Sequence, residues 1–199
     1  SIGVVAGTTK PDLALAFVQY IVSPEGQAAP GAREYSIASL PGDGRVEFLI
    51  RLMRHPDGTP GLASGWLTQG APLGAAITLR LRAHRNFRLG DNLQRPLVLI
   101  GNGTGLAGLR SHLRARAAAG LGPNWLLFGE RNAAHDRLYG DELQAWCEGG
   151  VLQRLDLAFS RDRSEGAPRA YVQDLLAQSG DVLRQWVAQG AAIYVCGSL

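Results

Sequence analysis

The sequence predicts an α/β protein in which an antiparallel β unit precedes a parallel sheet covered on both faces by helices. Two observations support this prediction. From residue 96 onward, four short apolar runs alternate with helical segments, which is typical of a parallel sheet. Between residues 34 and 84, runs rich in β-branched and aromatic residues surround a Pro/Gly turn, HPDGTPG, and this pattern favours antiparallel strands.

The expected elements follow in order along the chain. One helix is predicted within residues 11–31, with Leu13, Phe17 and Ile21 on one face, followed by a Ser-Pro restart and a Pro/Gly-rich break. Antiparallel strands are expected in EYSIAS, RVEFLIRLM and ITLRLRAH. Parallel strands are expected in PLVLIG, NWLLFG, LDLAFS and AIYVCG. Helices are expected from about Leu106, around DELQAWCEGG and, as two short helices, across VQDLLAQSGDVLRQWVAQG.

The helix that begins near Leu106 has a predicted buried face and a predicted exposed face. At helical spacing its apolar residues should contact the sheet, whereas its arginines should face water. The apolar positions are Leu106, Leu109, Leu113 and Ala117, and the arginines are Arg110, Arg114 and Arg116.

Composition and charge exclude several classes of function. The 199 residues carry a formal net charge of only +3, with Lys and Arg scattered along the chain, so no nucleic-acid partner is expected. Cys147 and Cys196 form no CxxC motif, which argues against a disulfide framework or a zinc site. No metal is expected, because the four histidines, taken to be surface residues, do not cluster in the sequence. They are His55, His84, His112 and His135.

The sequence also bears on localisation. No apolar run approaches the roughly 20 residues of a membrane span, and the N-terminus lacks the features of a secretory signal. Because the cysteines are few and isolated, the expected setting is reducing and cytoplasmic. The chain starts at Ser1 and stops directly after a strand-like run, so we expect it to be a fragment.

The stretch GNGTGLAG links the first predicted parallel strand directly to the helix that is predicted from about Leu106. GxGxxG spacing occurs from Gly103 to Gly108, with Gly101 in front. Such a turn places backbone N–H groups and the positive end of a helix dipole where an anion can sit, and this favours phosphate binding. Steric packing is the alternative reason for the glycines. No Lys-Ser or Lys-Thr follows, which excludes a Walker-type loop.

The ends of the next two predicted strands carry candidate partners for a ribose or its phosphate. Glu130 could hold a ribose hydroxyl and imply NAD, whereas Arg131 could pair with a 2′-phosphate and imply NADP. Ser160 and Arg161 could share the same phosphate. Two candidate phosphate partners at adjacent strand ends favour NADP. The alternative is that these residues are ordinary surface arginines.

The motifs resemble those of the ferredoxin-NADP reductase superfamily and, within it, the diflavin reductases, most closely the flavoprotein subunits of NADPH-dependent sulfite reductases. The resemblance covers about residues 32–199. Its motifs are REYS, GLAS, GNGTGLAG, NWLLFGER, RLDLAFSRD, AYVQ and IYVCG. The resemblance implies a partial antiparallel FAD-binding β-barrel followed by a parallel-sheet, Rossmann-like NADP-binding domain that is truncated at its C-terminus.

The resemblance implies how the chain would hold FAD. In REYS, Arg33 would bind the pyrophosphate, Tyr35 would lie against the isoalloxazine ring, and Ser36 would lie near the nitrogen that accepts hydride. Backbone amides and the Ser hydroxyl of a short helix-opening segment would hold the same pyrophosphate. That segment is Gly61, Leu62, Ala63 and Ser64. Without the family, Ser64 would be read as a helix cap.

The resemblance also implies an NADPH site in the second half of the chain. Cys196 would lie beside the nicotinamide and, with Ser36, is a predicted catalytic residue. The pyrophosphate turn would be Gly101, Gly103, Thr104 and Gly105. The residues expected around the adenosine ribose and its 2′-phosphate are Arg131, Ser160, Arg161, Arg169, Tyr171 and Gln173. The sequence departs from the family at Arg169, where lysine is expected, at Gly108, where proline is usual, and at Ser198, where an acidic residue is usual.

The expected function follows from this resemblance. Hydride would pass from NADPH to FAD, and electrons would then go singly to an FMN domain or a haem-containing acceptor, without a general acid or base. The alternative is a non-catalytic NADP-binding remnant that no longer holds flavin, because the barrel strands before REYS are missing from the sequence.

Residues 1–30 do not fit that family. TTKPDLALAFVQYIVSPEGQAA resembles the C-terminal region of periplasmic, molybdate-type solute-binding proteins, and no function is carried over from it. Three segments are therefore predicted. They are an unrelated N-terminal helical segment over 1–30, a partial FAD-binding domain over 31–94 and an NADP(H)-binding domain over 95–199.

Overall fold

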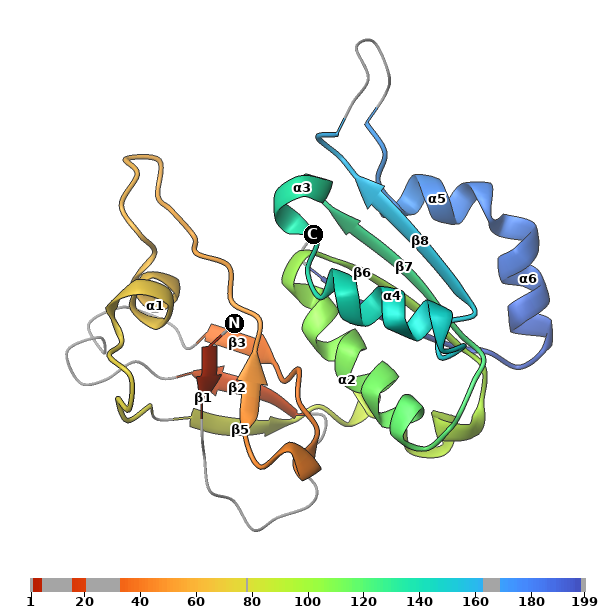
Figure 1. Ribbon diagram of the computed structural model, residues 1–199, viewed down its shortest axis with the longest axis horizontal. Helices are drawn as coiled ribbons and strands as arrows, with labels where there is room; N and C mark the ends of the chain where they lie inside the picture. The colour runs from red at the N-terminus through yellow and green to blue at the C-terminus, as the bar shows by residue number, and fades with distance from the viewer. Residues whose placement is uncertain (1, 5–15, 21–32, 78, 163–168, 198–199) are drawn as a thin grey trace. The chain divides into compact units, whose positions relative to one another are not determined.

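The computed structural model describes residues 2–4, 16–20, 33–77, 79–162 and 169–197 (Figure 1). The chain divides into two compact units, Ser1–Arg88 and Leu89–Leu199. The predicted segment boundaries at residues 30 and 94 remain predictions. No helix in the described ranges is long and apolar enough to cross a membrane.

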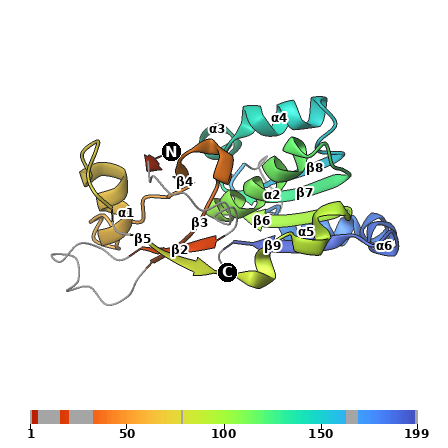
Figure 2. The same ribbon diagram turned by 90° about the horizontal axis from the view of Figure 1, so that it is seen from below.

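The second unit contains the parallel sheet that the sequence predicts. Figure 2 shows its four strands side by side, in the order β8-β7-β6-β9, and all three pairings are parallel. The strands are β6 (Leu97–Asn102), β7 (Asn124–Glu130), β8 (Arg154–Phe159) and β9 (Ala192–Cys196). All four predicted strand positions are confirmed.

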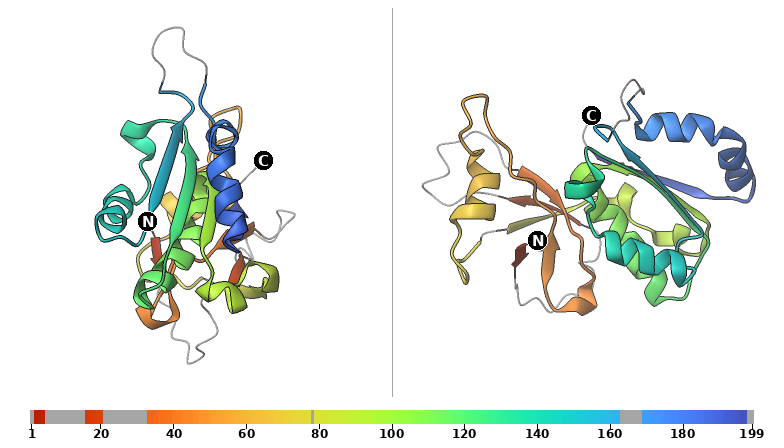
Figure 3. Two further views of the ribbon diagram at one scale, coloured as in Figure 1. Left: turned by 90° about the vertical axis from the view of Figure 1, so that its right-hand side faces the viewer. Right: turned by 45° about the horizontal axis from the view of Figure 1, so that its top comes forward.

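Helices cover both faces of this sheet (Figure 3, left). On one face lie α2 (Leu106–Ala118), α3 (Ala133–Asp136) and α4 (Gly140–Glu148). On the other face lie α5 (Val172–Gln178) and α6 (Gly180–Ala188). The short 3-10 turns of this unit are η5 (Gly90–Gln94) and η6 (Gly103–Gly105). An α/β fold with a Rossmann-like parallel sheet is therefore confirmed.

Alternating strand residues supply the two halves of the core. Val98, Trp125 and Leu127 pack with Trp186 of α6, and the rings of Trp125 and Trp186 lie 5.7 Å apart. Beneath α2, the opposite face of the strands meets leucines that are fully buried, as predicted for Leu106, Leu109 and Leu113.

The predicted exposed face of α2 is wrong for Arg110 and Arg116. Arg116 is fully buried and Arg110 is 9% exposed, because α4 and the segment before β6 cover that side of the helix. Arg110 forms an ion pair with Glu142 (Nε–Oε2 2.5 Å) and lies over the Tyr139 ring. Arg114 retains partial exposure.

His112, which was expected at the surface, is also buried. Its ring packs against Tyr194 of β9 with centroids 4.6 Å apart. The prediction of a surface histidine is therefore wrong at this position, because β9 covers this side of α2.

The first unit is built from two small antiparallel sheets. In one, β1 (Ile2–Val4) pairs with β4 (Val46–Phe48). In the other, β2 (Ala16–Tyr20) lies between β3 (Arg33–Ser36) and β5 (Leu79–Ala83). The antiparallel β unit is thus confirmed. Its helical turns are η2 (Pro41–Asp43), α1 (Leu62–Gly65), η3 (Trp66–Gly70) and η4 (Arg85–Phe87).

The helix predicted within residues 11–31 is wrong where the structure describes it. Ala16–Tyr20 is a strand, with Phe17 opposite Ser36 on one side and Arg82 on the other. AFVQY combines aromatic and β-branched residues that suit a central strand, and pairing on both edges outweighs the helical spacing. The remainder of the predicted helix lies outside the described residues.

Candidate functional site

The glycine turn after β6 has the geometry of a strand-to-helix turn. β6 ends at Asn102, residues Gly103–Gly105 form a single 3-10 turn, and α2 begins at Leu106. Gly103 has φ of +56°, a left-handed conformation that side chains disfavour. The turn therefore opens a 13-residue helix, whose first backbone N–H groups have no partner within the helix.

Packing against the end of β9 accounts for two other glycines. A Cβ at Gly105 would overlap the Cys196 carbonyl group and come within 2.7 Å of Gly197 Cα. A Cβ at Gly101 would lie 2.6 Å from Leu109 Cδ1 and 2.8 Å from the Cys196 oxygen. The steric explanation thus applies to Gly101 and Gly105. Without side chains at these two positions, the turn lies directly against the half-buried Cys196.

The ends of β7 and β8 bring together the residues predicted at the ribose. Ser160 N donates to the Glu130 oxygen, and Arg161 N donates to the Arg131 oxygen, each at 2.8 Å. Asp162 Oδ2 accepts the N–H of Ala133 at 2.6 Å, which adds a third hydrogen bond between the residues that follow β7 and those that follow β8. Arg131 and Arg161 are exposed, and neither forms an ion pair with a carboxylate of the described residues.

Glu130, the alternative ribose partner, is turned inward. Its side chain is 6% exposed and its Oε2 accepts the N–H of Arg131 at 3.0 Å. Its Oε1 lies 3.8 Å from the position that a Cβ at Gly103 would take. The carboxylate is therefore packed under the glycine turn, while the cationic side chains next to it remain at the surface.

The start of α5 carries Tyr171 and Gln173, both exposed. Asp174 Oδ2 accepts the N–H of Tyr171 at 2.9 Å, which fixes the first turn. The Arg169 Nη1 lies 3.5 Å from the Tyr171 hydroxyl. The intervening loop, residues 163–168, lies outside the described part of the chain.

Gly129 belongs to the candidate site, although no motif in the sequence singles it out. A Cβ there would overlap Cγ2 of Val172, so only glycine lets the start of α5 approach the end of β7 this closely. Because Val172 follows Tyr171, this contact sets the position of Tyr171 beside the strand ends. The signal available in the sequence was the glycine of FGER, at the end of the apolar strand β7.

The predicted flavin residues of REYS lie on β3 in the first unit. Arg33 is exposed, and Tyr35 and Ser36 are half-buried. The Tyr35 ring lies 6.3 Å from that of Phe48. Burial raises the pKa of the Tyr35 phenol above its usual value, and the positive charge of Arg33 lowers it in part. The exposed guanidinium of Arg33 and the half-buried ring of Tyr35 thus lie on the same short strand.

The GLAS segment forms the beginning of α1, but Ser64 is not its cap. Gly61 occupies the N-cap position and Ser64 is the third helical residue, so the cap prediction is wrong. Ser64 is buried; its Oγ accepts the N–H of Met53 at 3.0 Å and donates to the Gly61 oxygen at 3.3 Å. Ala63 is buried and Leu62 is exposed.

Cys147 and Cys196 are not joined in a disulfide. Within the described ranges, no group of three or more His, Cys, Asp or Glu side chains could hold a metal ion.

Comparison with known proteins shows what this chain resembles. The family model for the oxidoreductase NAD-binding domain matches residues 99–199. The chain is 41% identical to the sulfite reductase [NADPH] flavoprotein alpha-component of Yersinia enterocolitica serotype O:8, over 83% of the chain and 28% of that relative. The corresponding proteins of Salmonella typhimurium and Yersinia pestis are 39% and 40% identical over the same shares.

Proposed function

The chain belongs to the oxidoreductase NAD-binding domain family, of the ferredoxin-NADP reductase superfamily, and we propose that it carries the NADPH and FAD sites of a flavoprotein reductase. Hydride would pass from NADPH to FAD, and electrons would leave singly for an FMN domain or a haem-containing acceptor. The chain spans 28% of the length of the curated relatives it matches.

The observation that carries this proposal is the backbone hydrogen bond between Arg131 and Arg161. Their backbone hydrogen bond joins the ends of β7 and β8, so two exposed guanidinium groups and the Ser160 hydroxyl occur within a few residues of that junction. Guanidinium groups bind phosphate through parallel N–H donors. This arrangement supports recognition of a 2′-phosphate and hence of NADPH.

The position of Glu130 supports the same choice over NADH. A ribose diol would need an accessible carboxylate at the strand end, yet the Glu130 carboxylate is buried and accepts the N–H of Arg131. The exposed groups beside it are positively charged. A nucleotide that carries a 2′-phosphate therefore gains contacts that NADH lacks.

The remaining roles follow from the same geometry. The N–H groups of Gly103, Thr104 and Gly105 open α2 and suit the nucleotide pyrophosphate. Tyr171 exposes 39% of its surface at the start of α5 and offers a ring for the adenosine. Gln173 and Arg169 flank it. Cys196 ends β9 against the same turn, where the nicotinamide would lie.

The first unit offers groups that fit FAD. The exposed guanidinium of Arg33 and the first backbone amides of α1 suit its pyrophosphate, and the half-buried Tyr35 suits its ring. The Ser36 hydroxyl would donate a hydrogen bond to a ring nitrogen of the flavin. Bound FAD would supply the hydride-accepting ring, and the protein's part is to hold and orient both cofactors.

The proposal is tested by incubating the purified chain with FAD, desalting it, and recording its visible spectrum before and after anaerobic addition of NADPH. Retained flavin absorbance that bleaches with NADPH supports the reductase. A protein that binds an NADP affinity matrix but stays colourless supports the alternative, a nucleotide-binding remnant without turnover. Flavin that NADPH does not bleach contradicts the proposed hydride transfer.

A further inference from the structure

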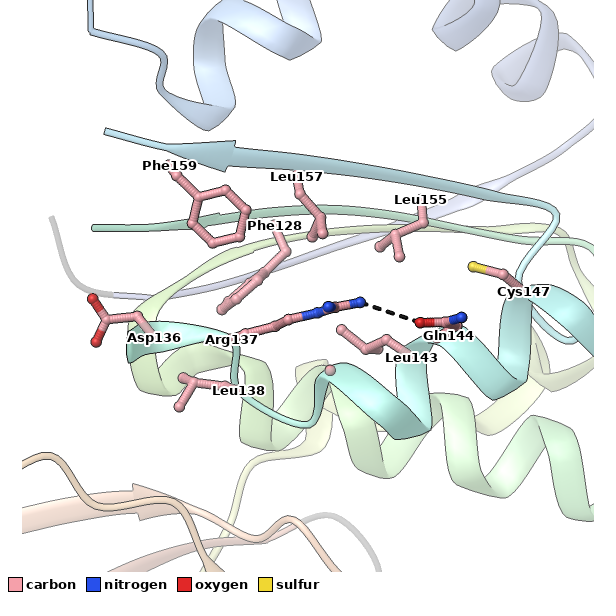
Figure 4. Close-up of a pocket in the computed structure, with 11 residues that line it drawn as sticks. Phe128, Asp136, Arg137, Leu138, Leu143, Gln144, Cys147, Leu155, Leu157 and Phe159 are labelled. Atoms are coloured by element: carbon pink, nitrogen blue, oxygen red, sulfur yellow. Dashed lines mark hydrogen bonds between the residues drawn. The ribbon is translucent and has the colours of Figure 1, made fainter. Parts of the chain in front are cut away.

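An apolar pocket lies on the face of the parallel sheet that α3 and α4 cover (Figure 4). Its volume is about 230 Å³, larger than the roughly 150 Å³ of an apolar cavity that binds benzene. Leu155, Leu157 and Phe159 of β8 line it from the same side, because alternate residues of a strand share a face. Phe128 of β7 and Leu143 of α4 complete the apolar lining.

One cationic side chain crosses this apolar pocket. Arg137 runs between Phe128 and Leu143 (Figure 4) and donates from Nη2 to Gln144 Oε1 at 3.3 Å. Among the described residues, its side chain has no other hydrogen bond or ion pair. A guanidinium carries five N–H donors, so Arg137 retains donors for a bound molecule.

The surroundings of Arg137 keep it in this position. A Cβ at Gly140 would lie 2.6 Å from Arg137 Cγ and 2.7 Å from its Nε, so the absence of a side chain there makes room for the arginine stem. Asp136 points away from Arg137 (Figure 4), and its Oδ2 accepts the N–H of Asn132 at 3.1 Å. The nearby carboxylate is thus directed elsewhere.

We propose that this pocket binds a small amphipathic carboxylate. Its ring or chain would pack on Leu155, Leu157 and Phe128, and its carboxylate would pair with Arg137. The apolar lining suits the hydrocarbon part, and the guanidinium selects an anion because it forms two parallel hydrogen bonds with a carboxylate. The proposal does not depend on the nucleotide site, which uses the strand ends and the start of α5.

Cys147 provides the readout, since its free, exposed thiol lies at the end of the pocket away from Asp136 (Figure 4). The whole chain is alkylated with N-ethylmaleimide with and without 2-naphthoate, and labelling of Cys147 and Cys196 is measured by peptide mass spectrometry. We expect 2-naphthoate to slow labelling of Cys147 and to leave Cys196 unchanged. The neutral analogue 2-naphthamide should need about tenfold higher concentration for equal protection.

Two variants identify the group that selects the anion. Arg137→Gln should remove the preference for 2-naphthoate over 2-naphthamide. Arg184→Gln, a matched loss of charge at a 75% exposed side chain of α6, should preserve it. Unchanged labelling of Cys147 at millimolar 2-naphthoate, equal protection by both ligands, or equal slowing at Cys196 would each overturn the proposal. Survival of the preference in Arg137→Gln would also overturn it.

Discussion

The Nε of Arg116, near the end of α2, donates to Oδ1 of Asn124 at 2.8 Å, and both side chains are fully buried. Nη1 of the same guanidinium donates to the backbone oxygens of Leu93 and Arg95, at 2.5 and 2.7 Å, and Nη2 to that of Pro123 at 3.1 Å. One side chain therefore joins α2, the start of β7 and the segment that leads into β6.

Replacing Arg116 should destabilise the second unit strongly. Arg116→Met removes four hydrogen bonds and leaves buried acceptors unsatisfied, so we expect a loss of about 3 kcal/mol in unfolding free energy. Urea unfolding followed by circular dichroism measures it. Arg114→Met on the same helix is the control and should cost below about 1 kcal/mol, because its ion pair is partly exposed. Equal losses in the two variants would contradict this structural role of Arg116.

Gly105→Ala should separate the glycine turn from β9. The added methyl group overlaps the backbone at Cys196, and overpacking of this kind costs about 1–3 kcal/mol. We expect a lower melting temperature together with weaker NADP⁺ binding in calorimetry. Gly180→Ala, where the nearest atom to the new methyl group is 3.7 Å away, should change neither. Full NADP⁺ affinity in Gly105→Ala would argue against a role for this turn.

Gly129→Ala should displace the start of α5 through its overlap with Val172. Because Tyr171 precedes Val172, NADP⁺ affinity should fall about tenfold. Val172→Ala in the same chain removes the overlapping atom and should restore most of the affinity. If the double variant binds as weakly as Gly129→Ala, the contact does not position Tyr171.

Arg33→Gln should raise the pKa of Tyr35 further. Burial already raises this pKa and the Arg33 charge opposes the rise, so removal of a nearby cation disfavours the phenolate. Any stability that the raised pKa supplies is present below the usual phenol pKa and is lost as pH rises through the folded value. Absorbance titration at alkaline pH, with Tyr35→Phe subtracted, follows this group. A lower pKa in Arg33→Gln would contradict the assignment.

The second half of the fold could be predicted from the sequence because local pattern and tertiary environment agree there. Short apolar runs between helices gave all four strands of the parallel sheet, and the spacing of Leu106, Leu109 and Leu113 gave the buried face of α2. Arg116 and His112 could not be predicted as buried, since the residue spacing along α2 does not show which segments outside the helix cover these two side chains. Ala16–Tyr20 was misassigned because strand partners on both edges decide its conformation.

The candidate site could likewise be predicted only in part from the sequence. The residue types at the ends of β7 and β8 could be read from the sequence, because parallel strands end at one edge of a sheet. The backbone bonds between Arg131 and Arg161, the inward position of Glu130 and the need for glycine at residue 129 depend on distances between strands. No sequence pattern encodes those distances directly.

Calorimetry can compare the binding of 2′,5′-ADP and 5′-AMP to the unmodified chain and to Arg161→Ala, and this comparison decides whether the ends of β7 and β8 recognise a 2′-phosphate. The two ligands differ by one 2′-phosphate and require no flavin. We expect the unmodified chain to bind 2′,5′-ADP at least about tenfold more tightly than 5′-AMP. We also expect Arg161→Ala to lose this preference and Arg184→Ala to keep it. Equal affinities for both ligands, or a preference that survives in Arg161→Ala, would contradict the NADPH site at the ends of β7 and β8.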